Sequence, residues 1–296
     1  MKVLFAAVIV SLFSFNICIG QSLNMADVFS NTHGLKQKDV TFYEVEGYEI
    51  TVQVDKVKWD EKGITKLKRK YKIDKESKGG RDSLFSLNRC FKKIEKRTEK
   101  VKQSGIYYFF PQGEDEVLTI SLQTLLSRDT LLEYFFVRYI LNYSIPDFLY
   151  SPAVIDSVKF ANRYIKLGPV CQWMGVHNVQ CSTYGQMNWA EFRSLEKAQE
   201  MIASQLDLNI NNNLAKVLNQ DTVSVVFEGI ETTAIKLIYQ FKIPEIIAGC
   251  NTFAVYFICC EVRGKFVGGV LSQCVYDIET KKLAPLLREV MSLKID

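Results

Sequence analysis

The chain has 296 residues, of which 48% are hydrophobic and 12% aromatic, and its net charge is +4 at pH 7. This length and apolar content allow a sizeable buried core, in one large domain or two smaller ones, and argue against disorder. Abundant aromatic residues (19 Phe, 14 Tyr and 3 Trp) beside only 6 Pro favour a sheet-rich globular protein.

The first twenty residues have the pattern of a secretory signal peptide. A short positive n-region precedes an apolar stretch at 3–15, and Cys18 and Gly20 place small residues at −3 and −1. The apolar stretch is too short to span a membrane, which needs about 20 residues. We therefore expect a secreted, periplasmic or cell-envelope protein that is soluble after cleavage before Gln21. A lipoprotein acylated at Cys18 is the disfavoured alternative, because no small residue directly precedes that cysteine.

A basic region lies in the first half of the chain. Residues 56–103 hold 18 Lys or Arg against 7 Asp or Glu, so the rest of the chain is net negative. Alternating apolar and polar residues over 48–59 predict a half-buried strand. The turn at 60–63 ends in glycine and predicts that 64–73 returns as the second arm of a basic hairpin.

The apolar spacing over 84–101 predicts a helix, with Asp82 or Ser83 as its N-cap and Gly105 beyond its end. Its opposite face would carry cations, several of them i,i+4 neighbours that repel each other mildly. An anionic partner, such as an acidic polymer or a membrane surface, would offset that repulsion; a solvated face is the ordinary alternative. The predicted anion-binding residues are Arg89, Lys92, Lys93, Lys96, Arg97 and Lys100, joined by Lys66, Lys68, Arg69 and Lys70 of the hairpin.

Two more elements are predicted before the middle of the chain. Residues 106–110 and 117–122 predict a hairpin around a Pro-Gln-Gly turn, and Asp129 caps a predicted aromatic-rich helix that ends near residue 143. The loop between Pro146 and Pro152 is the expected boundary between halves. The expected division is a signal peptide at 1–20, an N-terminal half at 21–150 and a C-terminal half at 151–296.

The C-terminal half is predicted to consist mainly of strands. Short strands are expected near 158–167, 170–174, 179–182 and 186–192. Ser194 caps a predicted helix over 195–206, and a short second helix would end at Leu218. Four strands then follow at 223–227, 232–241, 252–262 and 266–276, the last two joined by a tight Arg263-Gly264 turn, before a final helix at 283–293.

These elements define the fold class as α+β, with antiparallel sheets and packed helices, because connections this short require antiparallel pairing. A helix followed by a four-strand meander resembles cystatin-like folds, in which a helix packs in the concave face of a sheet. The resemblance covers element order alone and implies no function.

Eight cysteines become seven once residue 18 is removed. In an exported chain, cysteines are more often paired than catalytic or metal-binding. Cys171 and Cys181 flank a turn and would face each other in a hairpin, so they form the best candidate disulfide. Cys250 with Cys274 is a weaker second candidate, since a register with Phe253 opposite Cys274 leaves Cys250 about three residues away.

No motif reaches the specificity of a catalytic signature. The two histidines, His33 in the N-terminal segment and His177 at a hairpin tip, lie in no zinc or nucleophile–base pattern, so neither a metal nor a cofactor is expected. Paired carboxylates for glycoside hydrolysis stay possible, because such pairs meet in space and not in sequence. Four aromatic residues could line a ligand face, although cross-strand core pairs are the commoner role: Tyr164, Trp173, Tyr184 and Trp189.

The expected function is therefore that of an exported, non-enzymatic binding protein whose ligand is a protein, glycan or lipid. The alternatives are a hydrolase of envelope or extracellular polymers that uses spatially paired carboxylates, and a polyanion-binding protein that uses segment 56–103. A nucleic-acid partner is not expected, and the sequence leaves the oligomeric state open.

Overall fold

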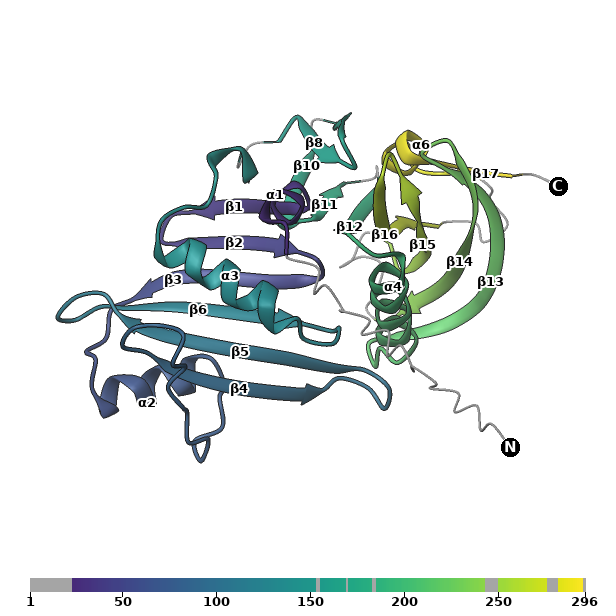
Figure 1. Ribbon diagram of the computed structural model, residues 1–296. Helices are drawn as coiled ribbons and strands as arrows, with labels where there is room; N and C mark the ends of the chain where they lie inside the picture. The colour runs from purple at the N-terminus through teal and green to yellow at the C-terminus, as the bar shows by residue number, and fades with distance from the viewer. Residues whose placement is uncertain are drawn as a thin grey trace, which may run out of the picture.

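The computed structural model describes residues 23–152, 155–168, 170–182, 185–242, 250–275 and 282–294. The predicted signal peptide and Tyr184 lie outside this part of the chain. The described part is α+β, as predicted, with two large sheets and a separate two-stranded hairpin (Figure 1). Among the described residues, no helix is both long and apolar enough to cross a membrane.

The N-terminal sheet has seven strands in the order β4-β5-β6-β3-β2-β1-β7, and only the β1–β7 pair is parallel. Its strands are β1 (Thr32–Gln37), β2 (Val40–Val45), β3 (Tyr48–Asp55), β4 (Arg89–Lys96), β5 (Lys102–Pro111), β6 (Val117–Thr124) and β7 (Tyr150–Ser151). The predicted hairpin of β5 and β6 is confirmed.

Three helices border this sheet. Helix α3 (Thr130–Leu141) crosses one face together with α1 (Met25–Ser30), and α2 (Glu61–Lys70) packs on the opposite face (Figure 1). A short 3-10 turn, η1 (Asp147–Leu149), leads into β7. Asp129 caps α3 as predicted, by accepting a hydrogen bond from the Leu132 amide at 3.0 Å.

The predicted second arm of the basic hairpin, 64–73, is wrong, because this segment belongs to helix α2. Asp60 accepts a hydrogen bond from the Gly63 amide at 2.7 Å and so caps the helix. Ile64 and Leu67, three positions apart, are then buried against the sheet.

The predicted helix over 84–101 is also wrong, because its centre is strand β4. Arg89–Lys96 pairs with β5 along its whole length, and Phe91 packs on Phe109 with ring centroids 5.5 Å apart. Leu84 and Leu87, which would have begun the buried stripe of the helix, are instead 63% and 52% exposed. Pairing with β5, the next strand along the chain, outweighed the helical pattern.

The C-terminal sheet has eight strands in the order β10-β11-β12-β16-β15-β14-β13-β17 and curves around helix α4 (Leu195–Ile210) (Figure 1). The strands are β10 (Cys171–Gly175), β11 (Asn178–Cys181), β12 (Gly185–Phe192), β13 (Ala215–Phe227), β14 (Ile230–Phe241), β15 (Thr252–Val262), β16 (Lys265–Cys274) and β17 (Met291–Leu293). The predicted helix and four-strand meander are confirmed, with Ser194 as the cap of α4.

The two faces of this sheet have separate cores. Ile202 of α4 packs on Leu237, Val255 and Phe257 on the concave side. The other face is covered by helix α6 (Pro285–Val290) and by the hairpin of β8 (Ser157–Phe160) and β9 (Arg163–Lys166).

Two predicted helices of this half are wrong in whole or in part. The short helix expected to end at Leu218 is the start of β13, which pairs with β14 from Ala215 onward. The last helix ends at Val290, because Met291–Leu293 joins the sheet edge beside β13 as β17. Both segments form backbone hydrogen bonds with a neighbouring strand, and the pattern of their own residues does not predict that pairing.

The predicted turn between β15 and β16 is confirmed. Arg263 and Gly264 have φ values of 48° and 75°, the left-handed pair that a two-residue hairpin requires. The pairing also places Phe253 opposite Cys274, as expected.

The Cys171–Cys181 disulfide is confirmed. The two residues are register partners of β10 and β11, with Cα atoms 4.0 Å apart. The second candidate is wrong: Cys250 carries a free thiol that donates a hydrogen bond to the Thr252 carbonyl, so it is not bridged to Cys274. The three-residue offset in register keeps these two cysteines apart.

Candidate functional site

A cleft of about 610 Å³ lies between the N-terminal sheet and the α4 side of the C-terminal sheet. One wall comes from β1, β2, β3, β5 and β6, and the other from α4, β12, β16 and the turn between β10 and β11. The cleft thus uses residues from both halves of the sequence. Its volume falls within the range of about 300–1,000 Å³ that is usual for small-molecule sites.

The wall from the N-terminal sheet is polar. Strand register places Glu44 opposite Glu49, and Glu49 opposite Gln123, so these side chains form a row across β2, β3 and β6. Gln103 of β5 donates a hydrogen bond to Gln123 at 3.1 Å. Period-2 alternation explains this wall, because the same strands turn Tyr48 and Ile50 toward the core under α3.

The facing wall is largely apolar. Met201, Ile202 and Leu208 of α4 line it together with Ala190 of β12 and Val270 of β16. Gly268 allows α4 to approach closely, since a Cβ there would lie 3.2 Å from Ile202 Cγ1. The wall from the N-terminal sheet is thus richer in polar groups and the α4 wall richer in apolar ones, although Asn178, Asn188 and Gln205 place amides on the α4 side as well.

The two histidines meet at the inner end of the cleft. Their rings pack edge to face with centroids 3.9 Å apart, and both residues are about 4% exposed. Strand β1 carries His33 into the junction between the sheets. His177 also stacks on Trp189, with centroids 4.8 Å apart.

Glu44 is the partner of His177. Its Oε2 lies 2.6 Å from His177 Nδ1, and its Oε1 accepts a hydrogen bond from the Gly47 amide at 2.9 Å. His177 Nε2 has no hydrogen-bond partner among the described residues. Glu191 Oε1 lies 3.9 Å from His33 Nε2 and accepts a hydrogen bond from the Ala161 amide at 2.8 Å.

Burial shifts the pKa values of the junction cluster (His33, Glu44, His177 and Glu191) toward the uncharged forms. It lowers the pKa of His177 to about 3 and holds the pKa of His33 well below its ordinary value. The same burial raises the pKa of Glu44 well above its usual range and also raises that of Glu191. All four shifts favour the uncharged form of the group concerned, which fits a dry junction.

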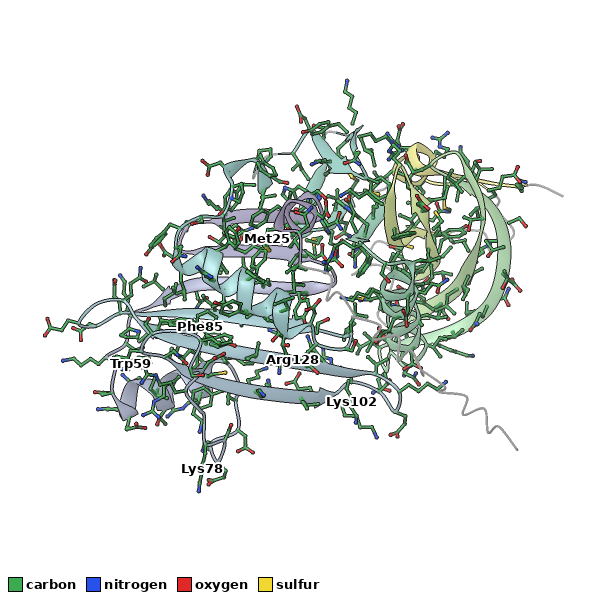
Figure 2. The ribbon with its side chains drawn as sticks, viewed as in Figure 1. Met25, Trp59, Lys78, Phe85, Lys102 and Arg128 are labelled. Carbon is green, nitrogen blue, oxygen red and sulfur yellow. A yellow bond between two sulfur atoms is a disulfide. The ribbon has the colours of Figure 1, made fainter. Side chains whose placement is uncertain are left out.

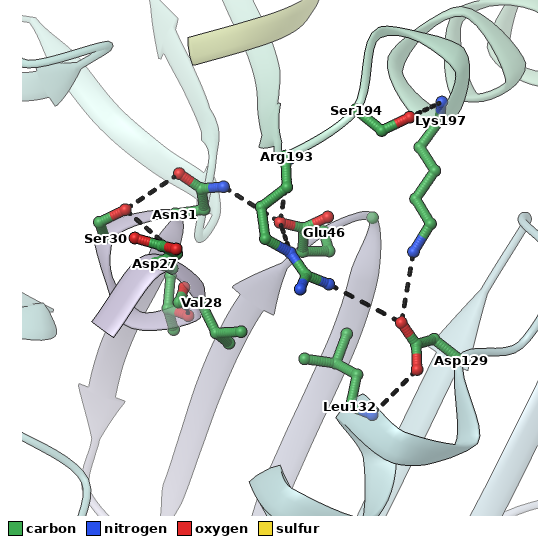
Figure 3. A network of polar contacts seen from close by, with 12 residues as sticks. Asp27, Val28, Ser30, Asn31, Glu46, Asp129, Leu132, Arg193, Ser194 and Lys197 are labelled. Carbon is green, nitrogen blue, oxygen red and sulfur yellow. Dashed lines mark hydrogen bonds and ion pairs between the residues drawn. The ribbon is translucent and has the colours of Figure 1, made fainter. Parts of the chain in front are cut away.

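A second polar network joins the halves beside this cluster (Figure 3). Glu46, in the β2–β3 turn, accepts hydrogen bonds from Asn31 at 3.0 Å and from the Arg193 side chain at 2.9 Å. The Arg193 guanidinium also lies 3.7 Å from Asp129, the cap of α3. Lys197 of α4 lies 3.4 Å from that same carboxylate. These contacts fix α4 relative to the N-terminal sheet.

The opposite end of the cleft is closed by the β4–β5 turn. Thr98 in this turn donates a hydrogen bond to Asp207 of α4. Arg97, which precedes it, lines the cleft and lies 3.2 Å from Glu95. Glu49 lines the cleft with an exposed side chain, and its pKa is raised by desolvation against the surrounding protein and partly lowered again by Arg97.

The residues of the predicted anion-binding face do not share one helix face. Four of them contact carboxylates: Arg89 contacts Glu61, Lys93 and Arg97 contact Glu95, and Lys96 contacts Glu99. Lys92 is exposed on β4, the sheet edge, where lysine discourages pairing with other chains. Lys100 lies in the β4–β5 turn. The basic segment spreads from Lys78, at a loop tip, to Lys102, at the far end of β5 (Figure 2). Binding of an anionic partner by these residues stays a prediction.

The aromatic residues considered for a ligand face separate. Trp173 lines the cleft and donates a hydrogen bond to the Pro152 carbonyl at 3.1 Å. Trp189 also lines it but is 3% exposed and packs on Phe160. Tyr164, 72% exposed on β9, is not part of the cleft.

The described residues offer no assembled metal site, since no group of three His, Cys, Asp or Glu side chains could hold an ion. Burial raises the pKa of Cys90, Cys259 and Cys260 to about 11, so these thiols are poor nucleophiles. The arrangement can bind and orient a ligand between two unlike walls.

Sequence reasoning missed Glu44, Glu49, Gln103 and Gln123. The signal that could have found them is polar alternation on strands whose other positions are apolar, because a sheet face that carries glutamines and glutamates is not a core face.

No family model matches the chain, and no curated protein matches it. Among solved structures, the di-domain ARO/CYC StfQ from the steffimycin biosynthetic pathway aligns over 83% of this chain and 74% of its own, at 8% identity and a TM-score of 0.18. The di-domain ARO/CYC BexL from the BE-7585A biosynthetic pathway aligns over 85% and 77%, at 9% identity and a TM-score of 0.17. Likenesses this low carry no inference about fold or ligand.

Proposed function

We propose that this chain is an exported binding protein that holds its ligand in the cleft between the two sheets. The observation that carries the proposal is the cleft of about 610 Å³ with one wall richer in polar groups and the other richer in apolar ones. Such a site orients a ligand through a few polar contacts while apolar surface supplies affinity. The Cys171–Cys181 disulfide supports an oxidising compartment, as the signal-peptide pattern does.

Binding is favoured over catalysis by the state of the histidine at the cleft. Both polar ring atoms of His177 are buried, and its Nδ1 faces Glu44. A general base must come within hydrogen-bond reach of its substrate, and although His177 lines the cleft, both of its ring nitrogens are buried. The junction cluster therefore acts as structural support for the wall.

The binding proposal is tested by filling the cleft. Gln205 of α4 lines the cleft, whereas Gln199, on an exposed part of the same helix, does not. The mature protein is incubated with small-molecule fractions of the medium in which the cells that export it are grown. Native mass spectrometry should then detect a complex with added mass. Gln205→Trp should abolish that adduct and Gln199→Trp should preserve it. An adduct that survives in Gln205→Trp, or no adduct with any fraction, contradicts the proposal.

One observation favours a second candidate, a hydrolase with paired carboxylates. Glu44 and Glu49 are register partners on the same cleft wall, and both have raised pKa values. It ranks second because both Glu44 oxygens already face Gly47 or His177 inside the protein. Release of reducing ends from oligosaccharides that is lost in Glu49→Gln would favour hydrolysis over simple binding.

A further inference from the structure

We infer that the ligand of the cleft is a neutral, hydroxyl-rich molecule of the saccharide class. The inference rests on the proposed binding function and adds the chemistry of the ligand. It rests on the polar side chains that line the cleft and on the apolar side chains that lie across from them.

The first step concerns the kind of polar group. Six amide side chains line the cleft: Gln37, Gln103, Gln123, Asn178, Asn188 and Gln205. An amide has two donors and one accepting oxygen, with no net charge. Gln103 already donates to the Gln123 oxygen, and the Asn178 oxygen accepts from Gln186, so these amides offer a ligand their remaining donors and lone pairs. A hydroxyl group also both donates and accepts, so a polyol can satisfy a row of amides. A carboxylate only accepts and an ammonium only donates, so each would leave part of every amide unused.

The second step concerns charge. Among the described residues that line the cleft, Arg97 is the single cation of the Lys and Arg type, and it already contacts Glu95 at 3.2 Å. Phosphate or nucleic-acid ligands need several such groups. A cationic ligand would need ionised carboxylates, and the pKa values of both glutamates that line the cleft, Glu44 and Glu49, are raised by desolvation, which disfavours their charged forms. The cleft therefore favours neither sign of charge.

The third step concerns the opposite wall. A pyranose ring carries hydroxyl groups around its rim, while its two faces expose C–H groups. Packing of those faces on Ile202, Val270 and the partly buried Trp173 removes apolar surface from water, which is favourable. The hydroxyl groups of the rim can then form hydrogen bonds with Gln123 and its neighbours. A lipid chain would leave the amides of both walls without partners, and this costs free energy for every buried polar group. A saccharide satisfies the amides and the apolar side chains at once.

The experiment uses the full mature chain on an array of neutral oligosaccharides, with acidic oligosaccharides and uncharged peptides as separate arms. We expect binding in the neutral saccharide arm, followed by titration calorimetry with the best neutral oligosaccharide found. Gln123→Leu, which keeps the side-chain size but removes the amide, should weaken that affinity about tenfold. Gln220→Leu, an exposed strand position on β13 outside the cleft, should leave it unchanged.

The outcomes separate this inference from the binding function. Binding only in the acidic or peptide arm, or no neutral saccharide bound at all, overturns the saccharide class. The binding function still stands in that case if Gln205→Trp removes an adduct seen by native mass spectrometry. Neutral saccharide binding that Gln205→Trp and Gln123→Leu both leave intact places the sugar elsewhere and overturns the inference as well.

Discussion

Replacing His177 by glutamine should remove a loss of stability that the protein suffers in acid. Burial lowers the pKa of His177 to about 3 in the folded chain, against about 6.5 in the unfolded chain. Between about pH 3 and 6.5, His177 is therefore protonated in the unfolded chain and neutral in the folded chain. Lowering the pH from 7.5 to 5 should therefore reduce the contribution of His177 to the free energy of unfolding by about 2 kcal/mol.

The wild-type profile alone would not show this effect. Glu44 has a raised folded pKa, so its contribution is present below about pH 4.5 and is lost as pH rises toward the folded value. Between about pH 4.5 and 6.5 the two groups act in opposite directions. His33 and Glu191, which face them from β1 and β12, oppose each other in the same way. The histidine effect is therefore isolated by comparing variant with wild type.

The assay is urea unfolding of wild type and His177→Gln at pH 7.5 and at pH 5. Relative to wild type, the variant should gain about 2 kcal/mol in free energy of unfolding on acidification. Gln180→Ala, an exposed position on the same hairpin, is the control and should show no such gain. An identical difference at both pH values would refute the idea that His177 is held neutral by burial.

Three more predictions concern stability and surface charge. The double change Cys171→Ser and Cys181→Ser should lower the free energy of unfolding by about 3 kcal/mol, measured in urea, because the bridge closes a short loop; no loss would contradict a formed disulfide. Glu46→Ala should lower the free energy of unfolding by about 3 kcal/mol, because Arg193 and Asn31 lose their shared acceptor. Calorimetry should show a lower Tm, and an unchanged Tm would show that this network does not hold the halves together. If segment 56–103 binds polyanions, retention on heparin should fall steeply with salt and fall further in Lys92→Glu with Lys96→Glu, at unchanged circular dichroism; retention unaffected by this change would leave these residues as an ordinary solvated edge.

Local chemistry allowed the elements with clear end signals to be predicted. Asp129 and Ser194 cap their helices within a few residues of chain, and the Arg263-Gly264 turn defines its own hairpin. The Cys171–Cys181 bridge likewise depends on one short hairpin. In each case the interacting groups are close in sequence, so the pattern contains the partner.

The errors arose where contacts between elements override the local pattern. Strand β4 has an apolar spacing that also suits a helix, and its pairing with β5, the next strand along the chain, together with the packing of Phe91 decides between the two. The final segment, Met291–Leu293, is drawn into a strand by β13. Periodicity describes which residues share a face but not which neighbour will cover that face.

The cleft could not be derived from sequence for the same reason. His33 and His177 belong to different sheets and meet only because the junction brings β1 against the β10–β11 turn. The polar wall needs the register of β2, β3 and β6, which sets Glu49 beside both Glu44 and Gln123. Polar alternation indicates that such a wall exists, whereas its facing wall depends on where α4 docks.

The Cys171–Cys181 disulfide should make the proposed ligand binding depend on redox conditions. It joins β11 to β10, the outermost strand of its sheet, and β10 carries Trp173 and Met174 to the rim of the cleft. A five-residue edge strand with a single neighbour frays readily once its covalent tie is cut. If the cleft holds a ligand as proposed, its affinity is then linked to the thiol–disulfide balance of the surroundings, and a reducing compartment would release what an oxidising one retains.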